Sequence, residues 1–137
     1  MKSVCFKFCW VFAMFFSLNA CMDRQSPVSE RFSTPEKTYR FWMEASEKED
    51  IPKSMQCLTE SSKRIMEAQL RQMDIFMARM RANVAIFGTY TLVDQKIKDD
   101  KAVVLLKGKN GDVIPVPMKK ESDGWKIDMV ALFSGSS

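Results

Sequence analysis

The spacing of apolar residues changes at Gly88, and this change limits the fold more than any other feature of the sequence. Before Gly88, apolar side chains recur at intervals of three and four residues, as on one face of an amphipathic helix. After it, apolar and polar residues alternate, which is typical of half-buried strands. Helices followed by strands predict an α+β domain, in which N-terminal helices pack on an antiparallel sheet.

Three helical segments are expected before Gly88. Residues 34–36 combine a capping threonine, a proline suited to the first turn and a glutamate at the positive end of the helix dipole, so a helix is expected over residues 35–48. One or two short turns are expected after Asp50, and a longer helix should run from Ser61 until Gly88 ends it. The continuous stripe of the longer helix contains Met66, Leu70, Met73, Met77, Met80, Val84 and Phe87.

Four strands are expected after Gly88, over residues 90–98, 101–107, 113–120 and 125–129. Asn110-Gly111, between the second and third strands, is a strong hairpin signal. Pro115 and Pro117 cannot donate ladder hydrogen bonds, so part of the third strand is expected at an edge or a bulge. One face of the last strand carries Trp125, Ile127 and Met129. This order predicts a four-stranded antiparallel meander.

The first twenty residues have the pattern of an export signal. Lys2 and Lys7 give a positive start without acidic residues, and Phe8–Leu18 is an apolar run of eleven residues. A membrane-spanning helix needs about 20 apolar residues, whereas the core of a signal peptide is shorter. Residues 1–20 are therefore predicted to be a signal peptide.

The sequence Leu18-Asn19-Ala20-Cys21 resembles the lipobox of bacterial lipoproteins. The resemblance implies cleavage between Ala20 and Cys21, with acyl chains on the Cys21 thiol and on the new amine. Each buried CH₂ of an acyl chain contributes about 0.8 kcal/mol, so two or three chains make a durable membrane anchor. The implied location is the cell envelope, facing the periplasm. By resemblance to enteric lipoproteins, Met22 in place of aspartate implies the outer membrane over the inner membrane.

The predicted leader and the composition set the domain boundaries. Polar residues 21–33, with one proline and three serines, are predicted to be a lipidated tether. A single domain is expected over residues 34–132, followed by a flexible tail at residues 133–137. Hydrophobic residues make up 46% of the chain and charged residues 28%, which fits a globular domain and excludes a disordered one.

The last predicted strand includes the sequence Asp123-Gly124-Trp125-Lys126-Ile127. Together with helices followed by a meander, it resembles the nuclear-transport-factor-2-like, or cystatin-like, α+β cone. The chain is similar to small bacterial lipoproteins that carry such a domain without an assigned function. The resemblance covers about residues 34–130 and implies a curved sheet around a long helix, with a pocket at the wide end. The family often dimerises through its sheet, so a homodimer is an open alternative.

The sequence contains no histidine, which excludes Ser-His-Asp and Cys-His catalytic sets and nearly every histidine-containing metal site. The resembling fold includes enzymes, such as ketosteroid isomerase and scytalone dehydratase, that use a pocket aspartate or a His–Asp pair with tyrosine donors. The carboxylate candidates here are Asp94, Asp128 and Glu44, with Tyr39 and Tyr90 as donors. The two aspartates alternate with apolar residues and are expected to face water. No catalytic residue is assigned, and a proton-shuttling isomerase or dehydratase stays an alternative.

Four methionines on the predicted stripe allow a second alternative, because thioethers are soft ligands that can hold Cu(I). They are Met66, Met73, Met77 and Met80. Flexible methionines also fill irregular cores, and this interpretation is preferred. No metal and no cofactor is assigned.

Cys57 is the only cysteine outside the predicted leader and lipidation site. It is expected to be a small buried hydrophobe, with an intermolecular disulfide as the alternative. The 21 basic and 17 acidic residues give a net charge of +4, but the two signs are interleaved. Binding of anionic lipid or nucleic acid is the alternative for basic residues that include Lys63, Arg64, Arg71, Arg79 and Arg81. A mixed, solvated surface explains the interleaved charges better, and no nucleic-acid partner is expected.

These features favour a non-catalytic, lipid-anchored binding or interaction module. Aromatic residues at Tyr39, Trp42, Tyr90 and Trp125 are the candidate pocket. An apolar small ligand or an envelope protein is the expected partner, in addition to the membrane that holds the lipid.

Overall fold

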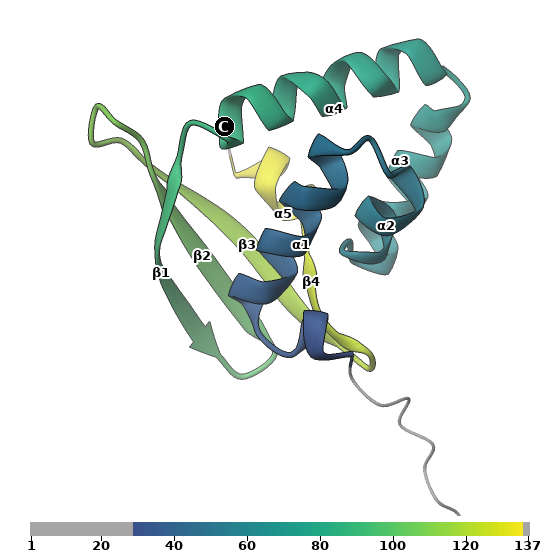
Figure 1. Cartoon of the computed structure of the whole chain (residues 1–137). Coiled ribbons are helices and arrows are strands. Elements are labelled where there is room, and N and C mark those ends of the chain that lie inside the picture. Colours follow the sequence, from purple (N-terminus) through teal and green to yellow (C-terminus); the bar gives the residue numbers. More distant parts are fainter. Residues whose placement is uncertain (1–28, 136–137) are drawn as a thin grey trace, which may run out of the picture.

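The structure is a computed structural model that describes residues 29–135 of the chain. The predicted leader, its cleavage site and Cys21 lie outside the described residues. Five α-helices and a short 3₁₀-helix, η1, surround one sheet (Figure 1). The helices are η1 Glu30–Phe32, α1 Pro35–Glu47, α2 Ile51–Gln56, α3 Glu60–Leu70, α4 Met73–Phe87 and α5 Met129–Ser134. The strands are β1 Thr91–Lys98, β2 Lys101–Lys107, β3 Val113–Glu121 and β4 Gly124–Ile127.

The sheet is an open antiparallel meander in the order β1-β2-β3-β4, so the predicted α+β class and strand order are confirmed. Tight turns join β1 to β2, β2 to β3 and β3 to β4. β4 pairs only with Met118–Glu121, so the part of β3 that holds Pro115 and Pro117 has no neighbour in β4. The prolines thus lie where β3 forms an edge of the sheet, as predicted. At an edge, no strand-to-strand hydrogen bond needs the N–H donor that proline lacks.

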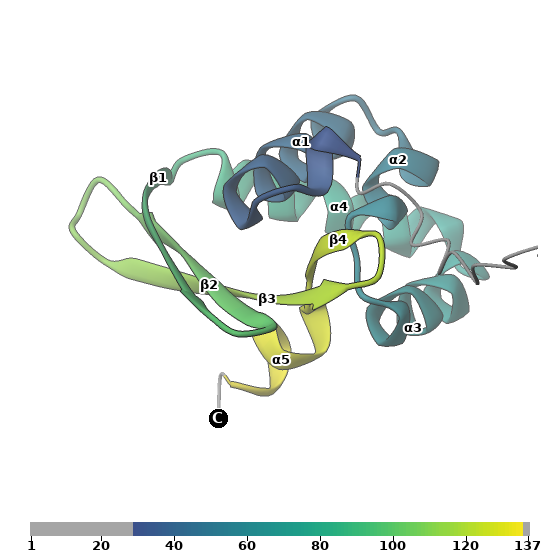
Figure 2. The ribbon, with the colours of Figure 1, turned by 90° about the horizontal axis from the view of Figure 1, so that it is seen from below.

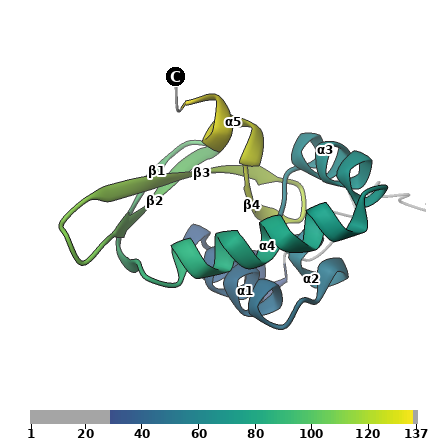
Figure 3. The same ribbon diagram turned by 90° about the horizontal axis from the view of Figure 1, so that it is seen from above.

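The two faces of the sheet are covered by different helices. α1 and α4 lie on one side, and α5 lies on the opposite side (Figures 2 and 3). α1 contacts β1, β2, β4 and α4, while α5 contacts β3 and α3. α3 lies beyond the β4 edge, so helices from both faces come together at this edge.

The core lies between α1, α4 and the inner face of the sheet. Tyr39 and Trp42 of α1 are buried there against Val104 and Leu106 of β2. The rings of Trp42 and Phe87 meet edge to face, with 5.7 Å between centroids. Full burial of each large apolar side chain contributes about 1.5–3 kcal/mol, so this layer dominates the stability of the domain.

Residues 30–32 belong to the folded part, although the tether was predicted to extend to residue 33. Phe32 is buried in the core, and the Lys126 ammonium lies 3.9 Å from its ring centroid. Gly124, at φ +125°, is packed closely against Phe32: a Cβ on Gly124 would lie 2.5 Å from both the Cβ and the carbonyl oxygen of Phe32. Only glycine fits this contact between η1 and the start of β4.

A segment between α2 and α3 runs along the free edge of β4. The Ile127 N–H donates to the carbonyl of Cys57 at 2.7 Å, and the Thr59 N–H donates to the carbonyl of Ile127 at 3.0 Å. Leu58 forms a parallel bridge with Ile127. Thr59 then caps α3 by accepting from the Ser62 N–H. These bonds fix the start of α3 relative to the sheet.

The long helix predicted from Ser61 to Gly88 is wrong, because the chain breaks into α3 and α4 at residues 71–72. Gln72 has φ −116° and ψ 69°, outside the helical region. Because of the break, the buried face of α4 differs from the predicted apolar stripe. Met73, which belongs to the stripe, is 48% exposed, whereas Phe76, which does not belong to it, is buried. No proline or glycine lies at the break, and α3 contacts α4 after it.

The predicted last strand is also too long. β4 ends at Ile127, and the Asp128 carboxylate accepts from the Ala131 N–H, which caps α5. Met129 is buried as expected, but from a helix and not from a strand. Phe133, assigned to the flexible tail, belongs to α5. In the part of the chain that the structure describes, no helix has the length and apolar character needed to cross a membrane.

Candidate binding pocket

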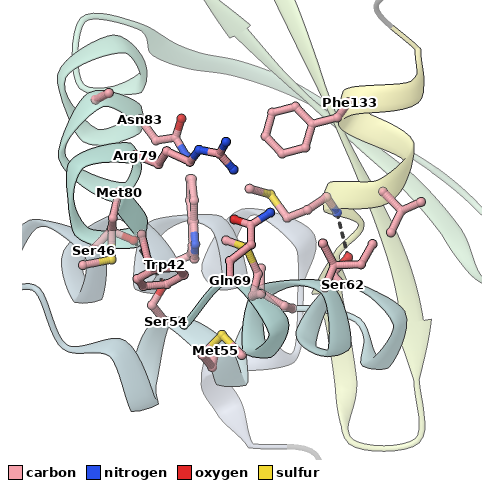
Figure 4. A pocket seen from close by; sticks show the side chains of 17 residues that line it. Trp42, Ser46, Ser54, Met55, Ser62, Gln69, Arg79, Met80, Asn83 and Phe133 are labelled. Atoms are coloured by element: carbon pink, nitrogen blue, oxygen red, sulfur yellow. Dashed lines mark hydrogen bonds between the residues drawn. The ribbon is translucent and has the colours of Figure 1, made fainter. Parts of the chain in front are cut away.

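The main pocket has a volume of about 600 Å³ and lies where the helices meet at the β4 edge (Figure 4). α1 and α2 contribute Trp42 and Met55, α3 and α4 form two walls, and α5 forms another. Three features position these helices: the hydrogen bonds of Cys57 and Thr59 to Ile127, the break at residues 71–72, and the Asp128 cap of α5. The segments that connect the helices and strands therefore shape the pocket.

Methionine is the most frequent residue type in the apolar walls of the main pocket. They come from four different helices and are Met55, Met66, Met80 and Met129. The other apolar lining residues are Trp42, Leu58, Ile65, Phe76, Ala82, Val130 and Phe133. Flexible thioether side chains adapt to ligands of different shape, so these walls can bind apolar ligands of more than one shape.

The serine hydroxyls of the main pocket are already used by the fold. Ser46 and Ser54 share a hydrogen bond at 3.3 Å between their hydroxyl oxygens. Ser62 accepts from the Met129 N–H at 3.0 Å and also bonds the Thr59 hydroxyl at 2.8 Å. These hydrogen bonds link α1 to α2 and α3 to α5, so the serine hydroxyls contribute to the fold.

Three other polar side chains of the main pocket are not used in this way. They are Gln69 on α3 and Arg79 and Asn83 on α4. Within residues 29–135 their side chains make no hydrogen bond and no ion pair. Arg79 and Asn83 are four residues apart and share a helix face, and Arg79 extends from α4 toward Phe133 of α5 (Figure 4). None of the described aspartates and glutamates lines the pocket.

A second, shallower groove of about 390 Å³ lies beside the α4–β1 junction. It is lined by Tyr39, Arg40, Met43, Glu44, Glu47, Phe87, Gly88, Tyr90, Thr91 and Leu92. The candidate aromatic residues are therefore divided: Tyr39 and Tyr90 line the groove, Trp42 lines the main pocket, and Trp125 is buried without lining either. Burial raises the pKa of Tyr39 to about 12.

The candidate acid–base residues do not form one constellation. Asp94 is exposed, and Asp128 is occupied as the cap of α5. Glu44 is near the two tyrosines, but its hydrogen bond from Lys48 lowers its pKa, opposite to what a general acid needs. The Tyr90 hydroxyl donates to Asp112, a hydrogen bond that raises the pKa of Tyr90.

The four methionines considered for Cu(I) are separated by the helix break. Met66 and Met80 line the main pocket, whereas Met73 and Met77 do not. Among residues 29–135, no group of three or more His, Cys, Asp or Glu is placed to hold a metal ion. Met55 and Met129 lie far from Met66 and Met80 in the sequence, and only the folded positions of α2 and α5 bring them to this pocket.

Cys57 is a buried structural residue, as expected. It is 0% exposed, and its thiol donates to the Lys53 carbonyl at 3.5 Å. Burial raises the pKa of Cys57 to about 12, so the thiol stays protonated and inert at neutral pH. A disulfide to another chain would require the local structure to open.

The comparisons with known proteins identify a family without adding a function. No curated protein and no solved structure matches the chain. A family model described as "Protein of unknown function (DUF2950)" matches residues 29–133, nearly the whole part that the structure describes. The match includes η1, all four strands and most of α5. The chain is therefore a member of the DUF2950 family.

Proposed function

We propose that this protein is a non-catalytic, lipid-anchored binding module of the bacterial cell envelope, and that its main pocket takes an apolar small molecule. The observation that carries this proposal is the pocket itself: about 600 Å³ with walls built mainly from apolar side chains of five helices. Small-molecule sites typically measure about 300–1,000 Å³ and are largely apolar, with a few polar groups that orient the ligand.

The chemistry of the lining favours binding over catalysis. Its serine hydroxyls hydrogen-bond within the fold, and it contains none of the described carboxylates that could move a proton. Each CH₂ that leaves water for such walls contributes about 0.8 kcal/mol, so an alkyl chain would bind through its length alone. Trp42 at the pocket offers a fluorescent reporter of occupancy.

The envelope location is proposed from the sequence. The positive start, the short apolar run and the lipobox-like residues 18–21 support cleavage before Cys21 and acylation of that residue. Outer-membrane attachment with the domain facing the periplasm is the favoured arrangement. Labelling with radioactive palmitate tests it: the wild-type chain should take up label, and Cys21→Ser should not. Equal labelling of both would remove the lipid anchor from the proposal.

We also propose that the domain is a divergent member of the nuclear-transport-factor-2-like folds. Its helices precede a meander, and such folds usually place a short strand between the second and third helices. Here Leu58, between α2 and α3, bridges Ile127 of β4 at that position. An experimental structure whose sheet superimposes poorly on that cone would reject this relationship without affecting the binding proposal.

Binding can be tested with the full chain in phosphatidylcholine nanodiscs, using the neutral probe 1-aminoanthracene. Ala82 lines the main pocket, whereas Ala85, one turn later on the same helix, lines neither hollow. Ala82→Trp should therefore block the pocket, and Ala85→Trp is the matched control. We expect saturable probe fluorescence with the wild type and the control, and at least a tenfold loss of affinity in Ala82→Trp. Identical signals from both variants would refute an apolar ligand in this pocket.

A further inference from the structure

We infer that the ligand of the main pocket is an anionic amphiphile, with one alkyl chain among the methionines and a carboxylate or phosphate head group on Arg79. This inference rests on the proposed apolar binding function and adds the chemical class of the ligand. It follows from an uneven distribution of charge: Arg79 is the only charged side chain in the lining of a pocket whose other walls are mainly apolar.

Arg79 differs from the arginine two residues later. Arg81 binds Glu49 through two bonds, Nε to Oε1 at 2.6 Å and Nη2 to Oε2 at 3.1 Å. Arg79 is an exposed residue that lines the pocket, and no carboxylate among the described residues is within ion-pair distance of it. A guanidinium presents a planar fork of donors that matches a carboxylate or phosphate. The guanidinium of Arg79 can therefore donate hydrogen bonds to a carboxylate or phosphate of a ligand.

Two neutral amides can assist Arg79. Asn83 lies one helical turn after it on the same face of α4, and Gln69 reaches the pocket from α3 (Figure 4). Both amides carry donors that make no hydrogen bond within residues 29–135. An anionic head group is therefore met by a cation and by neutral donors, with no competing carboxylate in the lining.

The opposite character of the remaining walls accounts for the alkyl chain. Trp42, Phe76 and Met80 are buried and form an apolar interior. Ile65, Val130 and Phe133 also line the pocket but are largely exposed, with Phe133 at 62%. A chain attached to the head group would cover these residues and shield them from water. Cationic at one side and apolar elsewhere, the pocket matches a single-chain anionic lipid.

The experiment compares ligands that share a chain but differ in charge. Dodecanoate, dodecyl phosphate and dodecanol are used to displace 1-aminoanthracene from the full chain in phosphatidylcholine nanodiscs. Arg79→Gln removes the cation, and Arg64→Gln is the control because Arg64 is exposed, forms no ion pair among residues 29–135 and does not line the pocket. Each affinity is expressed as a ratio to the wild type, which cancels partition into the lipid.

We expect Arg79→Gln to weaken dodecanoate or dodecyl phosphate by roughly tenfold, as for loss of a charge-assisted hydrogen bond, and to change dodecanol less than about twofold. The more strongly affected anion identifies the head group as a free fatty acid or as a phospholipid derivative. Equal loss for all three ligands, or no loss for either anion, would overturn the inference. Because 1-aminoanthracene is neutral, its own binding still reports the proposed function; absence of probe binding to the wild type would instead overturn that function.

Discussion

Lys126 and Arg79 show how differently one domain can treat a positive charge. Lys126 is 1% exposed, yet its ammonium donates to the Gln56 carbonyl at 2.8 Å, pairs with Asp123 at 2.8 Å and lies over the ring of Phe32. Arg79 lines a pocket and has no such partner in the described chain. A cation whose partners all belong to the protein stabilises the folded state. A cation that lines a cavity without such a partner can bind a ligand.

The largest expected effect concerns Lys126. Lys126→Ala removes three contacts from a buried position and leaves a hole beneath η1, so we expect the free energy of unfolding to fall by about 3 kcal/mol. Arg79→Ala should change it by less than about 0.5 kcal/mol. Urea denaturation of both full-chain variants measures the difference. If the two substitutions cost the same, the contrast between a structural and a recognition cation is wrong.

A second test acts on the contact between η1 and β4 without changing charge. Gly124→Ala places a Cβ 2.5 Å from the Phe32 carbonyl oxygen, at a φ of +125° that other residues rarely adopt. We expect a loss of about 2 kcal/mol. Gly111→Ala is the control, because Gly111 also has positive φ but has nothing within 4 Å. A cost for Gly124→Ala no greater than for the control would show that Phe32 is loosely held.

The smallest expected effect is a pH dependence from Cys57, which lies close to Lys126 in the same buried region. Burial raises the pKa of the thiol from 9.0 to about 12, so above pH 9 the unfolded chain loses a proton that the folded chain keeps. Stability therefore falls as pH rises, by about 1 kcal/mol between pH 8 and pH 10.

Cys57→Ala should lower stability at pH 8 but remove this part of the decline. Urea titrations of the wild type and the variant at the two pH values provide the measurement. An unchanged pH slope in Cys57→Ala would mean that the thiol is not desolvated. Tyr39, whose pKa is also raised by burial, adds to the decline above pH 10 in both proteins.

The parts of the fold that were predictable depend on local chemistry. The threonine cap and proline at the start of α1 set that helix boundary, and Asn110-Gly111 set the β2–β3 hairpin. The break at residues 71–72 was not predictable in this way, because Arg71 and Gln72 are ordinary helix formers and no local signal marks the end of a helix there. The start of α5 was not predictable either, because Trp125, Ile127 and Met129 alternate with polar residues as in a strand.

The site was less predictable than the fold, because it is assembled from residues far apart in the chain. Trp42 was expected at a pocket and lies there, but Tyr39 and Tyr90 line a different groove. Arg79 was named only as one of several basic residues that could bind anionic lipid or nucleic acid, and the interleaved charges favoured a solvated surface instead. The signal that could have distinguished it is the i, i+4 spacing of Arg79 and Asn83 on one face of α4.

The position of η1 limits how far the domain could travel if Cys21 carries lipid. Because η1 starts at Glu30 and not after residue 33, at most eight residues, 22–29, connect a lipidated Cys21 to the described helices. Fully extended, they span about 28 Å at 3.3–3.6 Å per residue. The short tether would thus keep the domain close to the bilayer surface. An alkyl ligand could then transfer between the membrane and the pocket with little exposure to water.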